Sequence, residues 1–248
     1  MKKLYFRFYE ELNDFLPEEK RKTRFTHNYV DRASVKDIIE SFGIPHTEVD
    51  LILVNSNSVT FDYLINDGDD ISVYPVFESL DITNAQHLRP IPLRNPKFIA
   101  DVHLGKLARY LRMMGFDVLY KKDFDDDEIV NISLLEKRAI LTKDRGILKC
   151  KEVTHGYWIR NTEVKEQAIE VIKRFDLKNI IKEFSRCIDC NSVLKPISKN
   201  EIIDDLPPKV SKSQVDFSQC PACKKIYWKG THYQQMLSFI QSVKDIEF

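Results

Sequence analysis

The segment from Lys97 to Asp144 constrains the fold of this chain most, because its apolar pattern alternates between strand and helix. Short apolar runs at 97–100, 116–120 and 139–142 predict three buried strands. The helix predicted after the first strand has an apolar stripe of residues three or four apart, namely Leu104, Leu107, Ala108, Leu111 and Met114. Gly115 is placed to end it. Strands that alternate with helices run parallel, so the segment predicts a parallel α/β sheet.

Acidic residues stand where these predicted strands end. Asp101 follows the first strand, and Asp144 follows the third. The carboxyl ends of parallel strands lie on one edge of a sheet, so we expect these two residues to be neighbours in space. A turn Asp that bonds its own backbone is the alternative role for Asp144.

An acidic run at 123–128 opens the second predicted helix. Asp and Glu also favour helix N-termini, so at most one or two members are expected to bind a ligand. We choose Asp126, with Asp125, Asp127 and Glu128 as competitors. Carboxylate oxygens are the ligands that Mg²⁺ and Mn²⁺ prefer, and such ions support phosphodiester hydrolysis.

Basic residues accompany the carboxylates. Lys106, Arg109 and Arg112 recur every three residues on the first predicted helix, opposite its apolar stripe, and Arg145 follows Asp144. Positive charge beside carboxylates draws phosphates toward a centre that would otherwise repel them. The alternative for the row on the helix is an ordinary solvated face.

Composition limits the classes of protein. The chain has 38 basic and 38 acidic residues, so any basic surface for a nucleic acid must be local. Hydrophobic residues make up 43% of the 248, which is enough for real cores. No apolar run reaches the length of a membrane span, and the first residues enter an alternating pattern rather than a signal-peptide core. We therefore expect a cytoplasmic protein without a membrane partner.

Four of the five cysteines form two Cys-x-x-Cys pairs, Cys187 with Cys190 and Cys220 with Cys223. Two such pairs can bind one tetrahedral Zn²⁺ in a closed structural site. A thioredoxin-like redox pair is the alternative, but neither pair follows a strand as that motif requires. We predict a zinc ribbon whose Pro-containing insert, 191–219, is a loop.

Lysines alternate with aromatic residues after the second cysteine pair. Tyr227 and Trp228 lie between lysines, a composition that suits single-stranded RNA because aromatic rings stack on bases. We take Trp228 as a candidate RNA contact. The alternative is that both rings pack the ribbon onto its neighbour. The amphipathic helix expected next carries Met236, Leu237, Phe239, Ile240 and Val243.

The first third of the chain predicts a separate small unit. Leu4, Phe6 and Phe8 alternate with more polar positions, as in a half-buried strand, and a polar loop is expected around 17–22. Ser34 and Asp37 form a capping box ahead of a helix. Further strands are expected at 23–30, 51–54, 59–61 and 71–76.

This order of hairpin, helix and further strands resembles the ubiquitin-like β-grasp of small sulfur-carrier proteins. A sulfur carrier ends in a free Gly-Gly tail, whereas this chain continues. We therefore expect a binding or scaffolding module and not thiocarboxylate chemistry.

Several motifs together resemble the Mut7-C RNase domain family. They are Phe98-Ile99-Ala100-Asp101, the run from Leu104 to Asp117, Leu141-Thr142-Lys143-Asp144-Arg145, the two cysteine pairs, and Tyr227-Trp228-Lys229-Gly230-Thr231-His232. The resemblance implies a PIN-like α/β nuclease fused to a zinc ribbon, often with an amino-terminal ubiquitin-like domain. By motif position it places the acidic centre on Asp101, Asp126 and Asp144.

The expected fold is therefore α/β: a PIN-like parallel sheet with flanking helices and a C-terminal zinc ribbon, preceded by an α+β ubiquitin-like β-grasp domain. The expected domains are the β-grasp at 1–78, a linker at 79–95, the nuclease at 96–184, and the ribbon with its helix at 185–248.

The functional hypothesis is a metal-dependent ribonuclease. The three aspartates hold Mg²⁺ or Mn²⁺, the basic residues position RNA, the zinc is structural, and the β-grasp offers a surface for a protein partner. A non-catalytic RNA-binding or adaptor protein is the main alternative. A toxin-like nuclease for one structured RNA is a weaker one.

Overall fold

The computed structural model describes residues 2–75, residue 88 and residues 96–246. Of the expected linker, 79–95, all but Leu88 lies outside the described residues. The chain divides into two compact units. The first unit comprises Met1–Asn95 with Asp125–Trp158, and the second comprises Pro96–Phe124 with Ile159–Phe248. The expected nuclease segment contributes to both units, and the domain boundaries stay a prediction.

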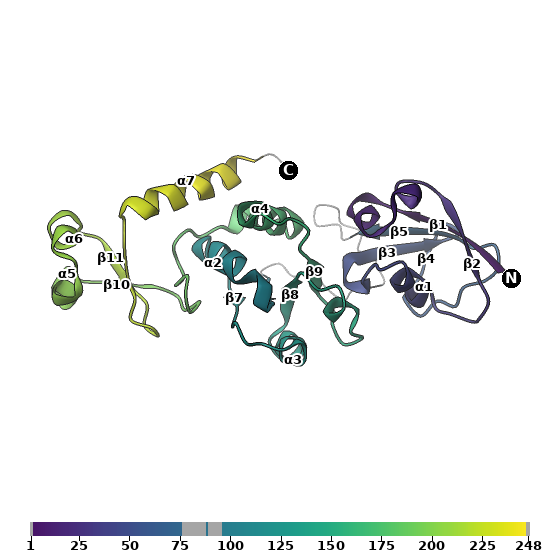
Figure 1. Cartoon of the computed structure of the whole chain (residues 1–248), viewed down its shortest axis with the longest axis horizontal. Coiled ribbons are helices and arrows are strands. Elements are labelled where there is room, and N and C mark those ends of the chain that lie inside the picture. Colours follow the sequence, from purple (N-terminus) through teal and green to yellow (C-terminus); the bar gives the residue numbers. More distant parts are fainter. Residues whose placement is uncertain (1, 76–87, 89–95, 247–248) are drawn as a thin grey trace. The chain divides into compact units, whose positions relative to one another are not determined.

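A five-stranded sheet forms the β-grasp part of the first unit, in the order β2-β1-β5-β3-β4 (Figure 1). The strands are β1 (Lys2–Phe8), β2 (Phe25–Tyr29), β3 (Val49–Val54), β4 (Asn57–Ser58) and β5 (Asp70–Pro75). The central strands β1 and β5 are parallel, and the other pairs are antiparallel. This arrangement is the ubiquitin-like order expected from the sequence.

Sequence periodicity explains the core of this sheet. Leu4, Phe6 and Phe8 of β1 are buried because alternate side chains of a strand share one face. Helix α1 (Val35–Ser41) covers that core, and Ser34 caps it through the expected capping box with Asp37. Two 3-10 helices follow β1, namely η1 (Glu10–Phe15) and η2 (Glu18–Lys20). Only η2 lies in the region 17–22, where a polar loop was expected.

One expected strand is wrong. Residues 59–61 form no strand, and β4 instead covers Asn57–Ser58. The turn before β4 consists of Asn55 and Ser56, whose φ angles are 50° and 69°. Positive φ at both central residues matches the twist of a tight hairpin. Sequence analysis expected a short turn at 55–58, but the turn occupies only the first two of these residues, so the next strand begins at Asn57.

The first unit also holds a parallel pair of strands, β8 (Arg138–Thr142) and β9 (Gly156–Trp158). Every residue of β8 is buried. Helix α3 (Asp126–Glu136) precedes β8, and η5 (Ile147–Lys149) lies between the strands. The β-grasp contacts this part through η3 (His46–Glu48), where Glu48 Oε1 accepts the Trp158 N–H at 2.8 Å.

The second unit contains the other parallel pair, β6 (Lys97–Ala100) and β7 (Val118–Leu119). They are joined by η4 (Val102–Leu104) and α2 (Gly105–Met113). Gly115 follows α2 with a φ of 96°, so the stop signal in the sequence is confirmed.

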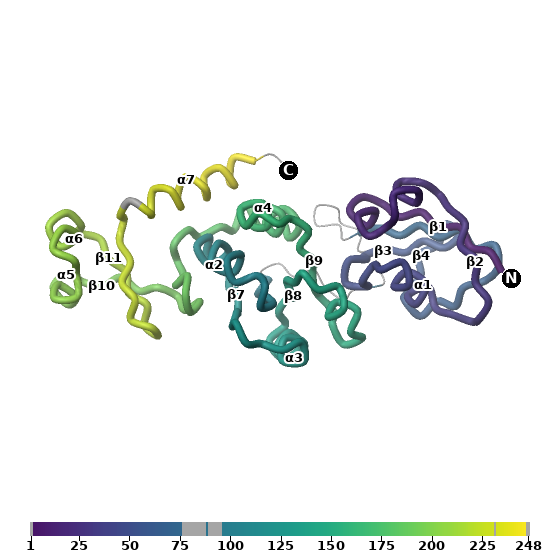
Figure 2. The backbone as a smooth tube through the Cα atoms, viewed as in Figure 1, coloured from purple at the N-terminus to yellow at the C-terminus, as the bar shows by residue number. Residues whose placement is uncertain are grey.

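Two helices pack with α2 in the second unit. Helix α4 (Val164–Arg174) contacts α2, and η6 (Lys178–Ile180) follows it. Helix α7 (Thr231–Asp245) runs back along this pair (Figure 2), and its Phe239 ring centroid lies 5.2 Å from that of Tyr110. The expected amphipathic helix is confirmed, because Phe239, Ile240 and Val243 are buried.

The ribbon is a three-stranded antiparallel sheet of β10 (Lys195–Ile197), β11 (Phe217–Gln219) and β12 (Ile226–Trp228). The insert between the cysteine pairs is not a simple loop. It contains α5 (Lys199–Ile202), η7 (Ile203–Asp205) and α6 (Pro208–Ser213). A small core of Ile202, Leu206 and Phe217 holds these helices.

The expected fold class is confirmed. The chain combines parallel strands flanked by helices, an N-terminal β-grasp and a C-terminal ribbon with a cysteine cluster.

Candidate functional site

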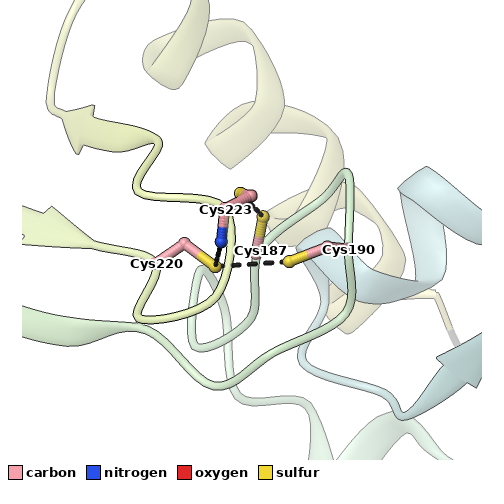
Figure 3. A group of neighbouring side chains, drawn as sticks. All are labelled: Cys187, Cys190, Cys220 and Cys223. Carbon is pink, nitrogen blue, oxygen red and sulfur yellow. Dashed lines mark hydrogen bonds between the residues drawn. The ribbon is translucent and has the colours of Figure 1, made fainter.

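The four paired cysteines meet in the second unit. The sulfur atoms of Cys187, Cys190, Cys220 and Cys223 lie within 4.8 Å of one another and point toward a common centre (Figure 3). Cys187 Sγ is 3.6 Å from Cys223 Sγ, and Cys190 Sγ is 3.2 Å from Cys220 Sγ. Sulfurs bound at about 2.3 Å to a tetrahedral zinc would be about 3.8 Å apart. The cluster could therefore hold a metal ion such as zinc.

Both cysteine pairs sit in the same kind of turn. Cys187 N–H donates to Ser192 O, and Asn191 N–H donates to Cys187 O. The same two bonds recur in the second pair, where Cys220 and Lys224 take the places of Cys187 and Asn191. Asn191 and Lys224 have φ angles of 72° and 61°. The repeated turn places two sulfurs from each loop on one centre.

Neighbouring groups brace the cluster. The Tyr227 hydroxyl lies 3.1 Å from Cys187 Sγ. Burial acts to raise the pKa of the Cys220 thiol, but hydrogen bonds outweigh it, chief among them one from the Cys223 backbone, so this pKa lies below its usual range. A lowered pKa favours the thiolate, the form that binds metal.

Arg112 contacts the loop of the first cysteine pair and does not lie on the solvent-exposed face of its helix. It is 2% exposed. Its guanidinium donates to the carbonyls of Val118, Ile188 and Asp189 at 2.9, 3.2 and 2.8 Å. Burial lowers its pKa, and the nearby cysteines and carboxylates oppose that shift. The expectation that Arg112 lies opposite the apolar stripe is wrong, because the cysteine loop covers this helix face.

The other two members of the basic row are exposed. Lys106 faces solvent, and Arg109 pairs with Asp189 at 3.1 Å. Lys225 contacts the same carboxylate at 2.5 Å. The hydrogen bond from Lys225 is the main cause that holds the pKa of Asp189 below its usual range. Arg109 thus lies beside the cysteine loop.

Asp101 directly follows β6 and is 5% exposed. Its Oδ1 accepts the His103 N–H at 2.8 Å as the N-cap of η4, and it lies 3.5 Å from His103 Nδ1. The exposed His103 is a titratable group that sequence analysis missed. Its signal was the Asp-x-His spacing directly after a predicted strand.

The acidic run opens α3 in the first unit. Asp125 is the N-cap, and it exchanges hydrogen bonds with Glu128 in a capping box. Asp126 and Asp127 are exposed and lie outside that box. Burial is the main cause that raises the pKa of Cys150, and the charges of Glu152, Asp126 and Asp127 add to it. Helix capping therefore accounts for Asp125 and Glu128. Asp126 and Asp127 are the two candidates for a metal ligand that lie outside the capping box.

Asp144 follows β8 and is exposed. Its Oδ1 accepts the Gly146 N–H at 2.7 Å, and its own N–H donates to Thr142 Oγ1 at 2.8 Å. The turn role considered for Asp144 is thus present. Asp126 and Asp144 lie in the first unit and Asp101 in the second. That the three carboxylates meet stays a prediction of the sequence.

Aromatic rings hold Arg145, the neighbour of Asp144. Its guanidinium carbon lies 4.8 Å from the ring centroid of Trp158 and 5.8 Å from that of Phe15. Trp158 Nε1 donates to Lys143 O at 3.2 Å. Sequence analysis missed Phe15 and Trp158 because they lie in segments far from Arg145 along the chain.

Trp228 ends β12 and is half-buried. It pairs in register with Phe217 and packs against the small ribbon core. Trp228 thus packs within the ribbon and remains partly exposed. The alternative that it packs the ribbon onto its neighbour stays a prediction.

Comparison with known protein families identifies the family of this chain. Residues 96–240 match the Mut7-C RNAse domain. The chain belongs to this family. Residues 1–81 match the Mut7-C ubiquitin family, in agreement with the sheet order of the first unit. A search of curated proteins and a search of solved structures gave no match.

Membership in the Mut7-C family points to a nuclease-like function. Both resemblances noted in the sequence are confirmed. Among the described residues, no helix is long and apolar enough to cross a membrane.

Proposed function

We propose that this Mut7-C protein is a metal-dependent ribonuclease whose centre is formed by Asp101, Asp126 and Asp144. The observation that carries the proposal is the match of residues 96–240 to an RNAse domain family. A carboxylate directly follows β6, and another lies two residues after the end of β8, as the proposed centre requires.

The donor set fits Mg²⁺ or Mn²⁺. All three side chains offer carboxylate oxygens, the ligands that these hard cations prefer. When bound, such an ion supplies Lewis acidity and neutralises charge on a scissile phosphate. Asp101 is buried and Asp144 is fixed by its turn, so their carboxylates would be oriented before the substrate binds.

Basic side chains would position the RNA. Lys106 and Arg109 are exposed one turn apart on α2, shortly after Asp101. Arg145 directly follows Asp144 and is exposed beside it. These cations would hold backbone phosphates near the carboxylates and keep them from being repelled. Arg112 is left out of this role because its donors are taken by backbone carbonyls.

The cysteine cluster would hold a structural zinc ion. Cys187 and Cys220 are buried. Four thiolates would fill every coordination position of a tetrahedral zinc ion and leave none open for catalysis. Cysteines that are not joined in disulfides suit a reducing compartment, which favours a cytoplasmic location. The ubiquitin-like module would offer a surface for a protein partner, since this fold commonly serves in binding.

The test is a cleavage assay with purified, zinc-loaded full chain and end-labelled single-stranded RNA. Mn²⁺ is withheld rather than chelated, because a chelator would also strip the cysteine cluster. Cleavage is expected only with Mg²⁺ or Mn²⁺. Asp144→Asn should lower the rate about 100-fold, which corresponds to about 2.7 kcal/mol of transition-state stabilisation.

Asp204→Asn is the matched control, because Asp204 is exposed in the ribbon insert. It should cleave like the wild type. A wild type that binds RNA without cleaving it would replace this proposal with the adaptor alternative. An Asp144→Asn variant that cleaves as fast as the wild type would instead remove Asp144 from the proposed centre.

A further inference from the structure

A pocket of about 290 Å³ lies in the ribbon half of the second unit, and none of the three aspartates lines it. It lies among residues from the segment before Cys187, from β11 and β12, and from the first two turns of α7. Its apolar lining includes Phe184, Leu194, Phe217, Trp228, Tyr233 and Met236. The volume falls at the lower end of small-molecule pockets, about 300–1,000 Å³, so it suits a single flat ring system.

One wall of the pocket is strained. Phe184 has a φ of 54°, a conformation that bulky residues rarely adopt. Its N–H donates to Met113 O at 2.8 Å, which holds the backbone there. The Phe184 and Tyr233 ring centroids are 4.4 Å apart. Strained backbone conformations that the surrounding structure maintains are found at binding sites. Here the strained residue places the Phe184 ring against the Tyr233 ring in the lining of the pocket.

Trp228 also lines the pocket. A Cβ at position 230 would come within 3.0 Å of Trp228 Nε1, so Gly230 leaves the indole edge room. The neighbouring Tyr227 is anchored on Cys187 Sγ. The cysteine cluster therefore fixes β12 and with it the orientation of Trp228.

The pocket lining carries two carboxylates and two cations, Arg186 and Lys229. Arg186 already donates to the carbonyls of Gly115 and Asn191 and pairs with Asp117, so the remaining polar groups suit a base better than a free phosphate. Glu183 and Asp216 contribute carboxylates, which are held by Lys244 at 3.1 Å and by Lys229 at 3.3 Å. Carboxylates repel phosphates but accept hydrogen bonds from the amino group of cytosine. Lys229 also lines the pocket, but its side chain is 57% exposed, and α7 begins without an acidic residue in its first turn. The positive charge of Lys229 and of the N-terminus of α7 would favour RNA phosphates at these positions, next to a base bound in the pocket.

We propose that this pocket binds one unstacked nucleobase of single-stranded RNA, held between aromatic rings. The inference rests on the proposed ribonuclease function and adds a binding site outside the acidic centre. Base stacking on aromatic side chains is how single-stranded RNA is commonly held.

Fluorescence can test the pocket without any cleavage. The chain has two tryptophans, so Trp158→Phe leaves Trp228 as the sole reporter. Asp144→Asn is added to prevent turnover. Pentacytidylate RNA should quench Trp228 emission on titration. A pentamer with the same sugar-phosphate backbone but no bases should bind about tenfold more weakly.

Variants of Tyr233 separate stacking from folding. Tyr233→Leu should weaken pentacytidylate binding about tenfold, and Tyr233→Phe should restore it, because only the ring is needed. Tyr9→Leu is the control, since Tyr9 stacks on Tyr74 at 4.2 Å in the β-grasp, outside the pocket. Zinc content and near-ultraviolet circular dichroism show whether each variant keeps its ribbon.

Equal affinity for the abasic and intact pentamers would overturn the proposal, as would unchanged binding by a folded Tyr233→Leu variant. Because these readouts need no cleavage, an inactive wild type would refute the ribonuclease without refuting the pocket.

Discussion

The guanidinium carbon of Arg145 lies 4.8 Å from the Trp158 ring centroid, and Phe15 lies on the same guanidinium at 5.8 Å. Phe15 comes from the β-grasp, whereas Arg145 directly follows Asp144. The ubiquitin-like module thus contacts the turn that carries one of the proposed catalytic carboxylates. We expect the module to support the geometry of that turn.

This contact should be measurable as a coupling energy. In a double-mutant cycle, Phe15→Leu and Arg145→Met should couple by about 0.5–1 kcal/mol in the free energy of unfolding, the usual size of an exposed cation–π contact. Urea unfolding followed by circular dichroism provides the measurement. Phe15→Leu combined with Arg24→Met should be additive, because Arg24 lies over Tyr5 and not over Phe15. Additivity in the Arg145 cycle would mean that the contact contributes nothing.

Loss of one buried cysteine should empty the metal cluster. Cys220→Ser replaces a fully buried cysteine of the proposed zinc site, so zinc content should fall from about one ion per chain to less than about 0.1. Near-ultraviolet circular dichroism from Tyr227 and Trp228 should change with it. Cys150→Ser should keep its zinc, because Cys150 is exposed and outside the cluster. Retention of a full zinc ion by Cys220→Ser would contradict the assignment.

The turn after α2 should tolerate only glycine. Gly115 has a φ of 96°, and a Cβ there would clash with Lys182 O. Gly68 has a similar φ of 87° but open space around it. Gly68→Ala should therefore cost about 1–2 kcal/mol from backbone strain alone, and Gly115→Ala should cost more. Equal costs in thermal or urea unfolding would show that the clash relaxes freely.

The capping box of α1 should make stability depend on pH. The pKa of Asp37 is lowered from 3.8, chiefly by the hydrogen bond from the Ser34 side chain. A lowered pKa in the folded state means that the stabilisation is present above the unfolded pKa of about 3.9 and is lost as pH falls through the lowered value. At pH 7 the free energy of unfolding of the wild type should exceed that of Asp37→Asn by less than about 1 kcal/mol, because solvent screens the charge of this exposed residue. The difference should vanish near pH 2, and a difference that grew on acidification would reverse the sign of this account.

Basic residues on α2 should contribute to RNA affinity through phosphates. Lys106→Gln should weaken binding of single-stranded RNA and reduce the slope of log affinity against log salt by about 0.7, the value for one neutralised phosphate of a single strand. Binding is measured with Asp144→Asn to avoid cleavage. Lys22→Gln, an exposed lysine of the β-grasp, should leave the slope unchanged. An unchanged slope for Lys106→Gln would remove this residue from the proposed RNA site.

Local patterns carried most of the fold. The stripe from Leu104 to Met114 and its glycine stop predicted α2 well, because periodicity and C-cap chemistry act within a few residues. The cysteine pairs were equally local, since each Cys-x-x-Cys forms one turn. The resemblance to the β-grasp rested on the order of elements along the chain, a hairpin and then a helix with a clear capping box.

What sequence analysis missed depends on distant residues. From its spacing, Arg112 was expected on the same exposed helix face as Lys106 and Arg109. Its guanidinium instead donates to the carbonyls of Ile188 and Asp189, which lie far along the chain. The contact of Phe15 with Arg145 joins two separate segments in the same way. In the acidic run, only the capping geometry separated Asp125 and Glu128 from Asp126 and Asp127.

The origin of the oxygen in the cleaved phosphate tests the central claim most directly. RNA cleaved by the zinc-loaded protein with Mn²⁺ in ¹⁸O-labelled water should carry one ¹⁸O in each new terminal phosphate, because water is the nucleophile in metal-dependent hydrolysis. Products with 2′,3′-cyclic phosphate ends, formed equally without Mn²⁺, would show attack by the 2′-hydroxyl of RNA and would contradict a carboxylate metal centre at Asp101, Asp126 and Asp144.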